Sequence, residues 1–304
     1  MRKLSRRELL YRSLAGVGAL AVAPMVLAGA EVTGEAVKPQ TATSWVPLGQ
    51  TGIRCSFLAM GTGMRGFQRS SEHTRMGEEK CCELIRYGVE KGINFLDMAD
   101  LYGTHPFVRK AIAGMPREKF VMLTKIWTYP DQVIKPSGGA LQEVDQYRKE
   151  LNTDMLDIVL IHCMQEKNWP EKQKRVRDEL LELKTKKVVR AVGVSCHNFD
   201  AMKTAVEDPW VDVLLARINN KGERMDASPE EVSELLLKAR ARGKVVLGMK
   251  IFGEGTLVQP EQKDASLKYV LGKGLVNAMT IGMLKKEEMD DSIARINATL
   301  KALG

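Results

Sequence analysis

Short apolar segments alternate with segments of helical periodicity along most of this 304-residue chain. Eight apolar segments follow one another in the order FLAMG, NFLDMA, FVMLTKI, LDIVLIH, VRAVGVS, VDVLLARI, KVVLGMKI and VNAMTIG. They are rich in Val, Ile and Leu and lack strict alternation, as expected of strands that are buried on both faces. Segments such as EEKCCELIRYGVEKG and SPEEVSELLLKARARG separate them. Eight strands, each followed by a helix, predict a (β/α)8 barrel, an α/β fold also called the TIM barrel.

A β-hairpin is expected before the barrel, because two short apolar stretches flank the turn sequence GQTG. An open doubly wound sheet is the alternative fold, but no G-x-G-x-x-G turn follows the first barrel strand. The segment AMGTGMRGF has glycines, yet the bulky Met64 and Arg65 stand where a phosphate-binding turn needs small residues. The barrel is therefore the preferred fold, and we expect it, with its hairpin, to span residues 44–304.

The first thirty residues have the three-part plan of an export signal. A basic start precedes an apolar segment, which ends in the small residues Ala28-Gly29-Ala30. Within the basic part, SRRELL resembles the twin-arginine signal, with the pair Arg6 and Arg7 followed by two leucines. A generic secretory signal is the alternative. The apolar segment contains glycine and proline and is short for a bilayer span, so no permanent membrane span is expected after cleavage.

These features predict a signal peptide at residues 1–30 and a linker at residues 31–43. The twin-arginine export machinery is then an expected partner, and the protein would lie in the periplasm, at the cell surface or outside the cell. An uncleaved signal that serves as an anchor is the alternative.

Charge and cysteine content exclude several classes of function. The net charge is +8 with a pI near 9.2, but outside the N-terminus the basic residues are interleaved with acidic ones, as in EKQKRVRDELLELKTKKVVR. This pattern is typical of a solvated helix face and does not indicate a nucleic-acid site. Five cysteines without a C-x-x-C motif, and four histidines without H-E-x-x-H, predict neither a disulfide framework nor a metal site.

Four residues that could carry chemistry follow the carboxyl ends of successive predicted strands, where barrel enzymes build their active sites. Asp97 ends the second strand and Tyr102 lies in the loop after it, Lys125 ends the third strand, and His162 ends the fourth. A buried charge is costly unless it is paired, so we expect Asp97 and Lys125 to pair. Singly, these four residues could be a helix cap, a packed aromatic, a salt-bridge member and a core histidine. Their joint occurrence argues against that interpretation.

The chemistry that this set suggests is proton donation by Tyr102. A phenol has a pKa near 10, so an active tyrosine needs a neighbouring cation that eases proton loss. Lys125 would supply the cation, Asp97 would orient it, and His162 would hydrogen-bond a substrate carbonyl. A barrel isomerase or lyase would need carboxylates and histidines clustered around a metal, and the sequence does not have them.

The segments FLDMADLYG, LTKIW and LIHCM, in this order and spacing, resemble the Asp, Tyr, Lys and His motifs of the aldo-keto reductase family. The resemblance implies a metal-independent oxidoreductase that reduces an aldehyde or ketone with NAD(P)H, or runs the reverse alcohol oxidation. Tyr102 would be the general acid, Lys125 and Asp97 its tuning pair, and His162 the carbonyl-orienting group. An exported, nicotinamide-binding sensor or partner protein with little turnover is the alternative, because free NADPH is not expected outside the cytoplasm.

The resemblance also implies a set of cofactor-binding residues, with two departures at the nicotinamide. Ser195 would hold the nicotinamide amide, but Cys196 follows it where the family usually has asparagine. Leu215 stands where the family commonly has glutamine, so Arg217 or Asn219 would substitute for that contact.

The phosphate-binding residues implied by the resemblance lie in the last two loops of the barrel. The loop over the pyrophosphate would contain Lys250, Ile251, Phe252, Gly253 and Gly255, and the adenosine-phosphate region would contain Gly282, Met283, Lys285, Lys286, Glu288 and Asp291. Glu288 falls where the family often has a phosphate-binding arginine, while Lys285 and Lys286 would compensate. The choice between NADP(H) and NAD(H) stays open, with NADP(H) slightly favoured on family habit.

The substrate pocket is expected to be lined by Trp127, Cys163 and Met164. Family members often have tryptophan directly after the catalytic histidine. Cys163 at that position implies a roomier or differently shaped pocket for a small-molecule carbonyl substrate.

Overall fold

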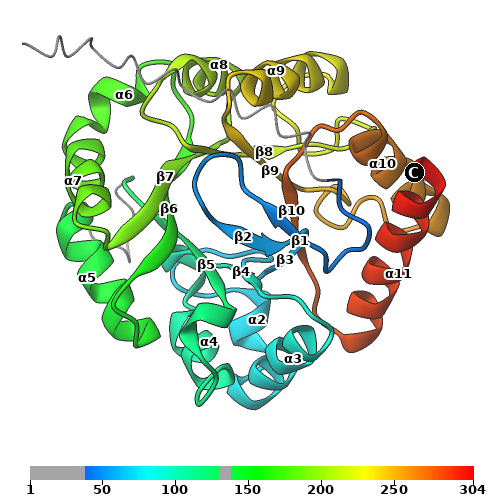
Figure 1. Cartoon of the computed structure of the whole chain (residues 1–304), viewed down its shortest axis with the longest axis horizontal. Coiled ribbons are helices and arrows are strands. Elements are labelled where there is room, and N and C mark those ends of the chain that lie inside the picture. The colour runs from blue at the N-terminus through cyan, green and yellow to red at the C-terminus, as the bar shows by residue number, and fades with distance from the viewer. Residues whose placement is uncertain (1–37, 130–137) are drawn as a thin grey trace, which may run out of the picture. The chain divides into compact units, whose positions relative to one another are not determined.

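The computed structural model describes residues 38–129 and 138–304. The predicted signal at residues 1–30 lies outside these residues. The chain forms a closed barrel of eight parallel strands surrounded by helices (Figure 1). The barrel strands are β3 (Leu58–Gly61), β4 (Phe95–Asp97), β5 (Val121–Ile126), β6 (Leu156–Met164), β7 (Val189–Cys196), β8 (Val213–Arg217), β9 (Val245–Met249) and β10 (Ala278–Gly282). Six of the eight apolar segments contain a whole barrel strand, and the other two cover all but the last one or two residues of β7 and β6. The predicted (β/α)8 fold is confirmed.

Helices cover the outside of the barrel (Figure 1), and many of their apolar residues belong to the hydrophobic core. They are α2 (Glu72–Arg75), α3 (Glu78–Glu90), α4 (His105–Ala111), α5 (Ala140–Leu151), α6 (Trp169–Lys172), α7 (Lys174–Thr185), α8 (Phe199–Glu207), α9 (Pro229–Ala241), α10 (Pro260–Gly272) and α11 (Lys286–Leu303). Helix α9 begins at a reciprocal capping box between Ser228 and Glu231, with Pro229 in its first turn.

The predicted hairpin consists of β1 (Trp45–Pro47) and β2 (Arg54–Ser56), and it lies across the barrel centre in Figure 1. Only one residue separates β2 from β3, so the hairpin is at the amino ends of the barrel strands. Ser56 and Asn94 fasten it there, because the Ser56 N–H donates to Asn94 Oδ1 at 2.6 Å and the Asn94 N–H donates to Ser56 Oγ at 3.1 Å. The hairpin therefore closes the floor of the barrel and leaves the carboxyl ends of the strands for a site.

The part of the predicted linker that the structure describes packs on the barrel. Ala42 is fully buried, its N–H donates to Asn297 Oδ1 at 2.7 Å, and its carbonyl accepts from the Leu58 N–H at 2.7 Å. Contacts with the barrel thus begin before residue 44.

All five cysteines of the chain are reduced and buried. They are Cys55, Cys81, Cys82, Cys163 and Cys196. Burial raises the thiol pKa of each, to about 12 at Cys81 and Cys163. Within residues 38–129 and 138–304, no helix is both long enough and apolar enough to span a bilayer.

Candidate active site

A buried ion pair lies at the carboxyl ends of the neighbouring strands β4 and β5. Asp97 is paired in register with Leu123, which places Lys125 two residues further along β5. Lys125 is 2% exposed, forms an ion pair with Asp97 and donates a hydrogen bond of 2.8 Å from Nζ to the Met98 carbonyl. Separation of Lys125 from Asp97 would leave each charge buried without a partner, which is costly. The ion pair therefore holds both side chains in place.

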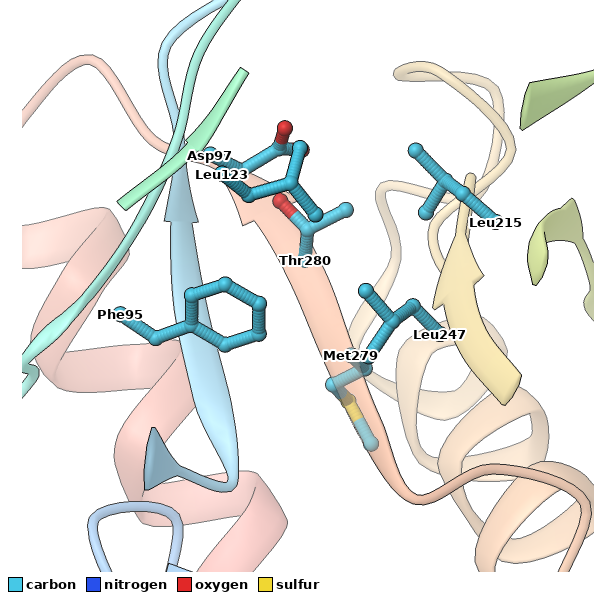
Figure 2. Close-up of a pocket in the computed structure, with 7 residues that line it drawn as sticks. All are labelled: Phe95, Asp97, Leu123, Leu215, Leu247, Met279 and Thr280. Carbon is cyan, nitrogen blue, oxygen red and sulfur yellow. The ribbon is translucent and has the colours of Figure 1, made fainter. Parts of the chain in front are cut away.

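The space below this pair is closed. Figure 2 shows Leu123, Thr280 and Leu215 toward the level of Asp97, with Phe95, Leu247 and Met279 below them. The apolar gap that they surround is too narrow to admit a water molecule. The barrel interior below Asp97 is therefore closed to ligands, and the space for a ligand lies at the carboxyl ends of the strands.

Tyr102 reaches the same place from the loop after β4. It ends the short 3-10 helix η1 (Asp100–Tyr102), and its ring packs against the backbone of the loop after β3. A Cβ atom at Gly63 would lie 2.2 Å from the Tyr102 ring, and one at Gly66 would lie 2.4 Å from it. Only glycine at these two positions admits the ring. Gly63 and Gly66 of the segment AMGTGMRGF thus make room for the Tyr102 ring, a role that differs from that of glycines in a phosphate-binding turn.

The structure brings the four predicted catalytic side chains together. Tyr102 Oη lies 3.4 Å from His162 Nε2, and the two rings meet edge to face with centroids 5.6 Å apart. Lys125 Nζ lies 4.9 Å from the centre of the Tyr102 ring. His162, on β6, is 4% exposed.

Burial sets the protonation states of this group. It raises the pKa of Tyr102 well above 10, and the charge of Asp97 raises it further. It lowers the pKa of His162 well below 6.5, helped by the charge of Lys125. The phenol is therefore protonated and the imidazole neutral near pH 7. The phenol pKa is thus raised in the folded protein, with burial of the ring as the largest cause.

The predicted substrate-pocket residues separate into two groups. The Trp127 ring meets the His162 ring edge to face at 5.6 Å, and Cys163 Sγ lies 3.4 and 3.5 Å from the two ring nitrogens of His197. The sulfur is thus nearly equidistant from the two ring nitrogens. Met164, in contrast, is fully buried in the hydrophobic core.

The sequence model of the aldo/keto reductase family matches residues 58–270, which include seven of the eight barrel strands. The chain belongs to the aldo/keto reductase family. Among curated relatives, 6-dehydroglucose reductase of Novosphingobium aromaticivorans is 26% identical over 235 residues, 70% of each protein. Methylglyoxal reductase DkgB of Escherichia coli O157:H7 is 29% identical over 142 residues, 43% of this chain. The chain spans about half the length of that reductase, 48%.

Solved aldo-keto reductases share the fold at low sequence identity. One from Pseudomonas aeruginosa superposes with a TM-score of 0.69 at 21% identity, covering 86% of this chain and 98% of that one. One from Klebsiella pneumoniae, solved with NADP and acetate, superposes with a TM-score of 0.63 at 16% identity, covering 88% and 95%.

Among the nicotinamide residues expected from the family, Ser195 and Asn219 have different surroundings. Ser195 Oγ accepts a hydrogen bond of 2.8 Å from the Cys163 N–H, which leaves the hydroxyl hydrogen for an amide oxygen. Asn219 uses its whole amide to join two loops. Its Nδ2 donates to the carbonyls of Glu223 and Lys250, at 2.8 and 3.1 Å, and its Oδ1 accepts from the N–H groups of Lys221 and Glu223.

The loop after β9, expected over the pyrophosphate, is a tight turn. Lys250, Gly253, Glu254 and Gly255 all have positive φ angles, between 58° and 91°. Lys250 Nζ lies 2.7 Å from Glu254 Oε1. Ile251 is buried and Phe252 is half-buried against the core. An anion at this loop would meet a lysine that a carboxylate of the same turn already neutralises.

The amino end of α11, expected at the adenosine phosphate, carries two exposed lysines, Lys285 and Lys286. Glu288 folds back and accepts the Leu284 N–H at 2.7 Å. The start of an 18-residue helix with two exposed cations suits a phosphate, because the helix dipole and the free N–H groups attract anions. The Leu284 N–H that Glu288 accepts precedes the N-cap residue Lys285, so this hydrogen bond does not occupy the free N–H groups of the helix start.

Three other positions implied by the family resemblance, Asp291, Met283 and Gly282, contact neighbouring residues of the chain, and their role at a cofactor stays a prediction. Asp291 pairs with Lys263 at 2.9 Å and with Arg295 at 2.7 Å. The Met283 carbonyl lies 3.0 Å from His73 Nε2, in the interior. A Cβ at Gly282 would lie 2.3 Å from Met64. In the part of the chain that the structure describes, no group of three His, Cys, Asp or Glu side chains is arranged to hold a metal ion.

Proposed function

We propose that this protein reduces an aldehyde or ketone with NAD(P)H, or catalyses the reverse oxidation, without a metal. The observation that carries the proposal is the buried contact of the Tyr102 phenol with the neutral His162 imidazole, 3.4 Å away, beside the Lys125–Asp97 pair. The names of the relatives support it, since two of them are reductases of carbonyl compounds.

Tyr102 would donate its proton to the carbonyl oxygen as that oxygen becomes an alkoxide. The bound dinucleotide supplies the hydride. The neutral His162 would donate a hydrogen bond from Nε2 to the same oxygen and hold it at Tyr102 Oη. Lys125 would stabilise the tyrosinate that forms, and Asp97 would keep the lysine in place. A raised phenol pKa suits this direction of reaction because it keeps the proton on Tyr102 until the carbonyl oxygen takes it.

NADP(H) is proposed over NAD(H). The Klebsiella relative was solved with NADP, and Lys285 and Lys286 at the amino end of α11 supply cations for a 2′-phosphate. Ser195 and the turn beginning at Lys250 would hold the nicotinamide amide and the pyrophosphate.

The test is to measure the binding of NADPH and NADH to the purified protein by fluorescence, and their oxidation with a panel of aldehydes and ketones. Turnover that Tyr102→Phe abolishes, with the cofactor dissociation constant unchanged, is expected. Binding without turnover on every carbonyl would favour the sensor or partner-protein alternative. Absence of dinucleotide binding at any concentration would contradict both.

We further propose that residues 1–30 direct export by the twin-arginine route, as their sequence pattern indicates. Replacement of Arg6 and Arg7 by lysine should retain the protein in the cytoplasm. Cell fractionation followed by immunoblotting checks this, and an unchanged distribution would contradict the route.

A further inference from the structure

The loop between β3 and α2, residues 62–71, contacts the short segment that carries Tyr102 at both ends of that segment. At the carboxyl end, Thr62 Oγ1 lies 2.9 Å from Thr104 Oγ1, and both residues are fully buried. Gly103, directly after Tyr102, packs on the loop backbone, because a Cβ atom at Gly103 would lie 2.1 Å from the Arg69 carbonyl oxygen. These uncharged contacts hold the chain that follows Tyr102.

An ion pair holds the amino end of the same segment. Asp100 begins the 3-10 helix η1, and its Oδ1 lies 2.7 Å from Arg69 Nη2. The Asp100 side chain is 4% exposed, whereas that of Arg69 is 44% exposed. Burial raises the pKa of Asp100, and the charge of Arg69 opposes that rise. Loss of the Arg69 cation would leave a buried carboxylate unpaired, which favours movement of Asp100 toward water.

The helix η1 is too short to keep its conformation by itself. Its backbone hydrogen bonds run from the Tyr102 N–H to the Ala99 carbonyl and from the Gly103 N–H to the Asp100 carbonyl, both at 3.1 Å. A single turn is unstable in isolation, because ordering its residues costs more than so few hydrogen bonds return. Asp100 and Tyr102 are the first and last residues of this turn. A displacement of the Asp100 carboxylate therefore moves the Tyr102 ring.

The backbone at Arg69 has a conformation that arginine does not favour. Gln68 and Arg69 form a two-residue turn, because Phe67 and Ser70 exchange backbone hydrogen bonds of 2.8 and 3.0 Å. Both turn residues have positive φ angles, 52° and 56°. Turns of this kind favour Asn-Gly, since other side chains are strained at positive φ. The contact of the Arg69 guanidinium with Asp100 compensates for this strain.

We propose that Arg69 is a positioning residue for Tyr102. Its ion pair with Asp100 fixes η1, and η1 in turn holds Tyr102 Oη beside His162 Nε2, where proton donation takes place. Arg69 acts through Asp100 and the backbone, and not on the substrate. The inference rests on the proposed reductase function.

The kinetic test uses NADPH and the aldehyde or ketone that the wild-type protein reduces fastest. Arg69→Met removes the cation, and kcat should fall by about 10- to 100-fold, as expected when a reacting group is displaced by about 1 Å. The KM for the carbonyl compound and the NADPH dissociation constant should stay at their wild-type values. Arg69→Lys, which keeps a cation within reach of Asp100, should recover most of the lost kcat. An unchanged kcat in Arg69→Met would overturn the proposal, and so would weaker NADPH binding, which would assign Arg69 to the cofactor.

A double-mutant cycle with Tyr102→Phe separates positioning from a general structural role. When the phenol hydroxyl is absent, Arg69→Met has no proton donor left to displace and should lower kcat no further. Equal losses in the presence and absence of the hydroxyl would show that Arg69 does not act through Tyr102.

Arg117→Met is the matched control. Arg117 pairs with Asp157 at the same distance, 2.7 Å, with side-chain exposures of 27% and 1%, but it precedes β5 at the opposite end of the barrel. This variant should lower the midpoint of thermal unfolding and leave kcat unchanged. Equal losses of kcat in Arg117→Met and Arg69→Met would assign both to destabilisation of the fold.

A measurement without turnover distinguishes failure of the positioning role from failure of the reductase function. With 3-fluorotyrosine incorporated at position 102, the 19F NMR spectrum of the NADP-loaded protein should show one narrow resonance at that site. Arg69→Met should broaden or split it, and Arg117→Met should not. That result without reduction of any carbonyl compound would sink the reductase function and keep the positioning role. An unaltered resonance in Arg69→Met would sink the positioning role even if carbonyl compounds are reduced.

Discussion

The Lys125–Asp97 and Arg217–Asp226 pairs stand at the same end of the barrel, yet they are built differently. Lys125 is 2% exposed, contacts Asp97 directly and also donates to a backbone carbonyl. Arg217 is separated from Asp226 by 3.6 Å, and each has a buried atom without a hydrogen-bond partner. The first pair is complete within the protein, and the second is not.

This difference separates two uses of buried charge. A complete pair fixes the geometry of neighbouring groups, here Tyr102 and His162, before any ligand arrives. An incomplete pair retains a donor and an acceptor that a ligand could use. Because these atoms are buried without a partner, the folded protein is less stable than it would be with a complete pair. Four predictions test this contrast, in order of decreasing size.

Tyr102→Phe tests whether the complete pair serves proton transfer. Loss of the general acid should lower kcat by about 10²- to 10⁴-fold, while the phenyl ring keeps its packing against Gly63 and Gly66. Single-turnover kinetics with NADPH would measure the loss, and the cofactor dissociation constant should stay at the wild-type value. A kcat within a factor of three of wild type would remove Tyr102 from the reaction.

Lys125→Met and Arg217→Met compare the two pairs directly. The first should lower the free energy of unfolding by about 3–5 kcal/mol, because Asp97 would be left as an uncompensated buried charge. The second should cost about 1–2 kcal/mol, since Asp226 already lacks a close partner. Urea denaturation of both variants measures this, and equal losses would contradict the distinction between the pairs.

Gly63→Ala tests whether catalysis depends on the position of the Tyr102 ring when its hydroxyl group is kept. The added Cβ would lie 2.2 Å from the ring, so the ring must shift, and kcat should fall by about 10- to 100-fold. Gly114→Ala is the control for backbone strain, because a Cβ there meets nothing within 4 Å while its positive φ disfavours alanine far from the site. Similar kinetic losses in both variants would mean that backbone strain alone explains the effect.

His197→Asn tests the electrostatics beside the incomplete pair. Burial, together with the charge of Arg217, lowers the pKa of His197 from 6.5 to about 3. Between these values the unfolded chain binds a proton that the folded protein does not, so stability falls as the pH falls from about 6.5 toward 3. The variant should flatten that fall by up to about 1.4 kcal/mol per pH unit. Chemical denaturation at several pH values checks it, and parallel curves would show that His197 is charged in the folded protein.

The fold could be predicted because buried parallel strands have a direct sequence signature. Eight segments rich in Val, Ile and Leu, each followed by a helical segment, correspond to β3 through β10. The proximity of Asp97, Lys125 and His162 could be predicted for the same reason, since parallel strands end at one face of a barrel.

The remaining features of the site depend on loop conformation, which periodicity does not encode. Asp226 reaches Arg217 only because the intervening loop turns back, with positive φ angles at Gly222 and Arg224. The amide of Asn219 joins the loops after β8 and β9, and its contact with a cofactor stays a prediction. The role of Gly63 depends on a contact with Tyr102, 39 positions away in the sequence, that no local pattern reveals.

The burial of all five thiols has a consequence for a protein that would fold in one compartment and work in another. Raised thiol pKa values keep the reactive thiolate scarce, and burial keeps oxidants and other thiols away from it. The five free cysteines of the folded barrel are therefore inaccessible to oxidants and to other thiols. These buried cysteines are thus protected in an oxidising environment as in a reducing one.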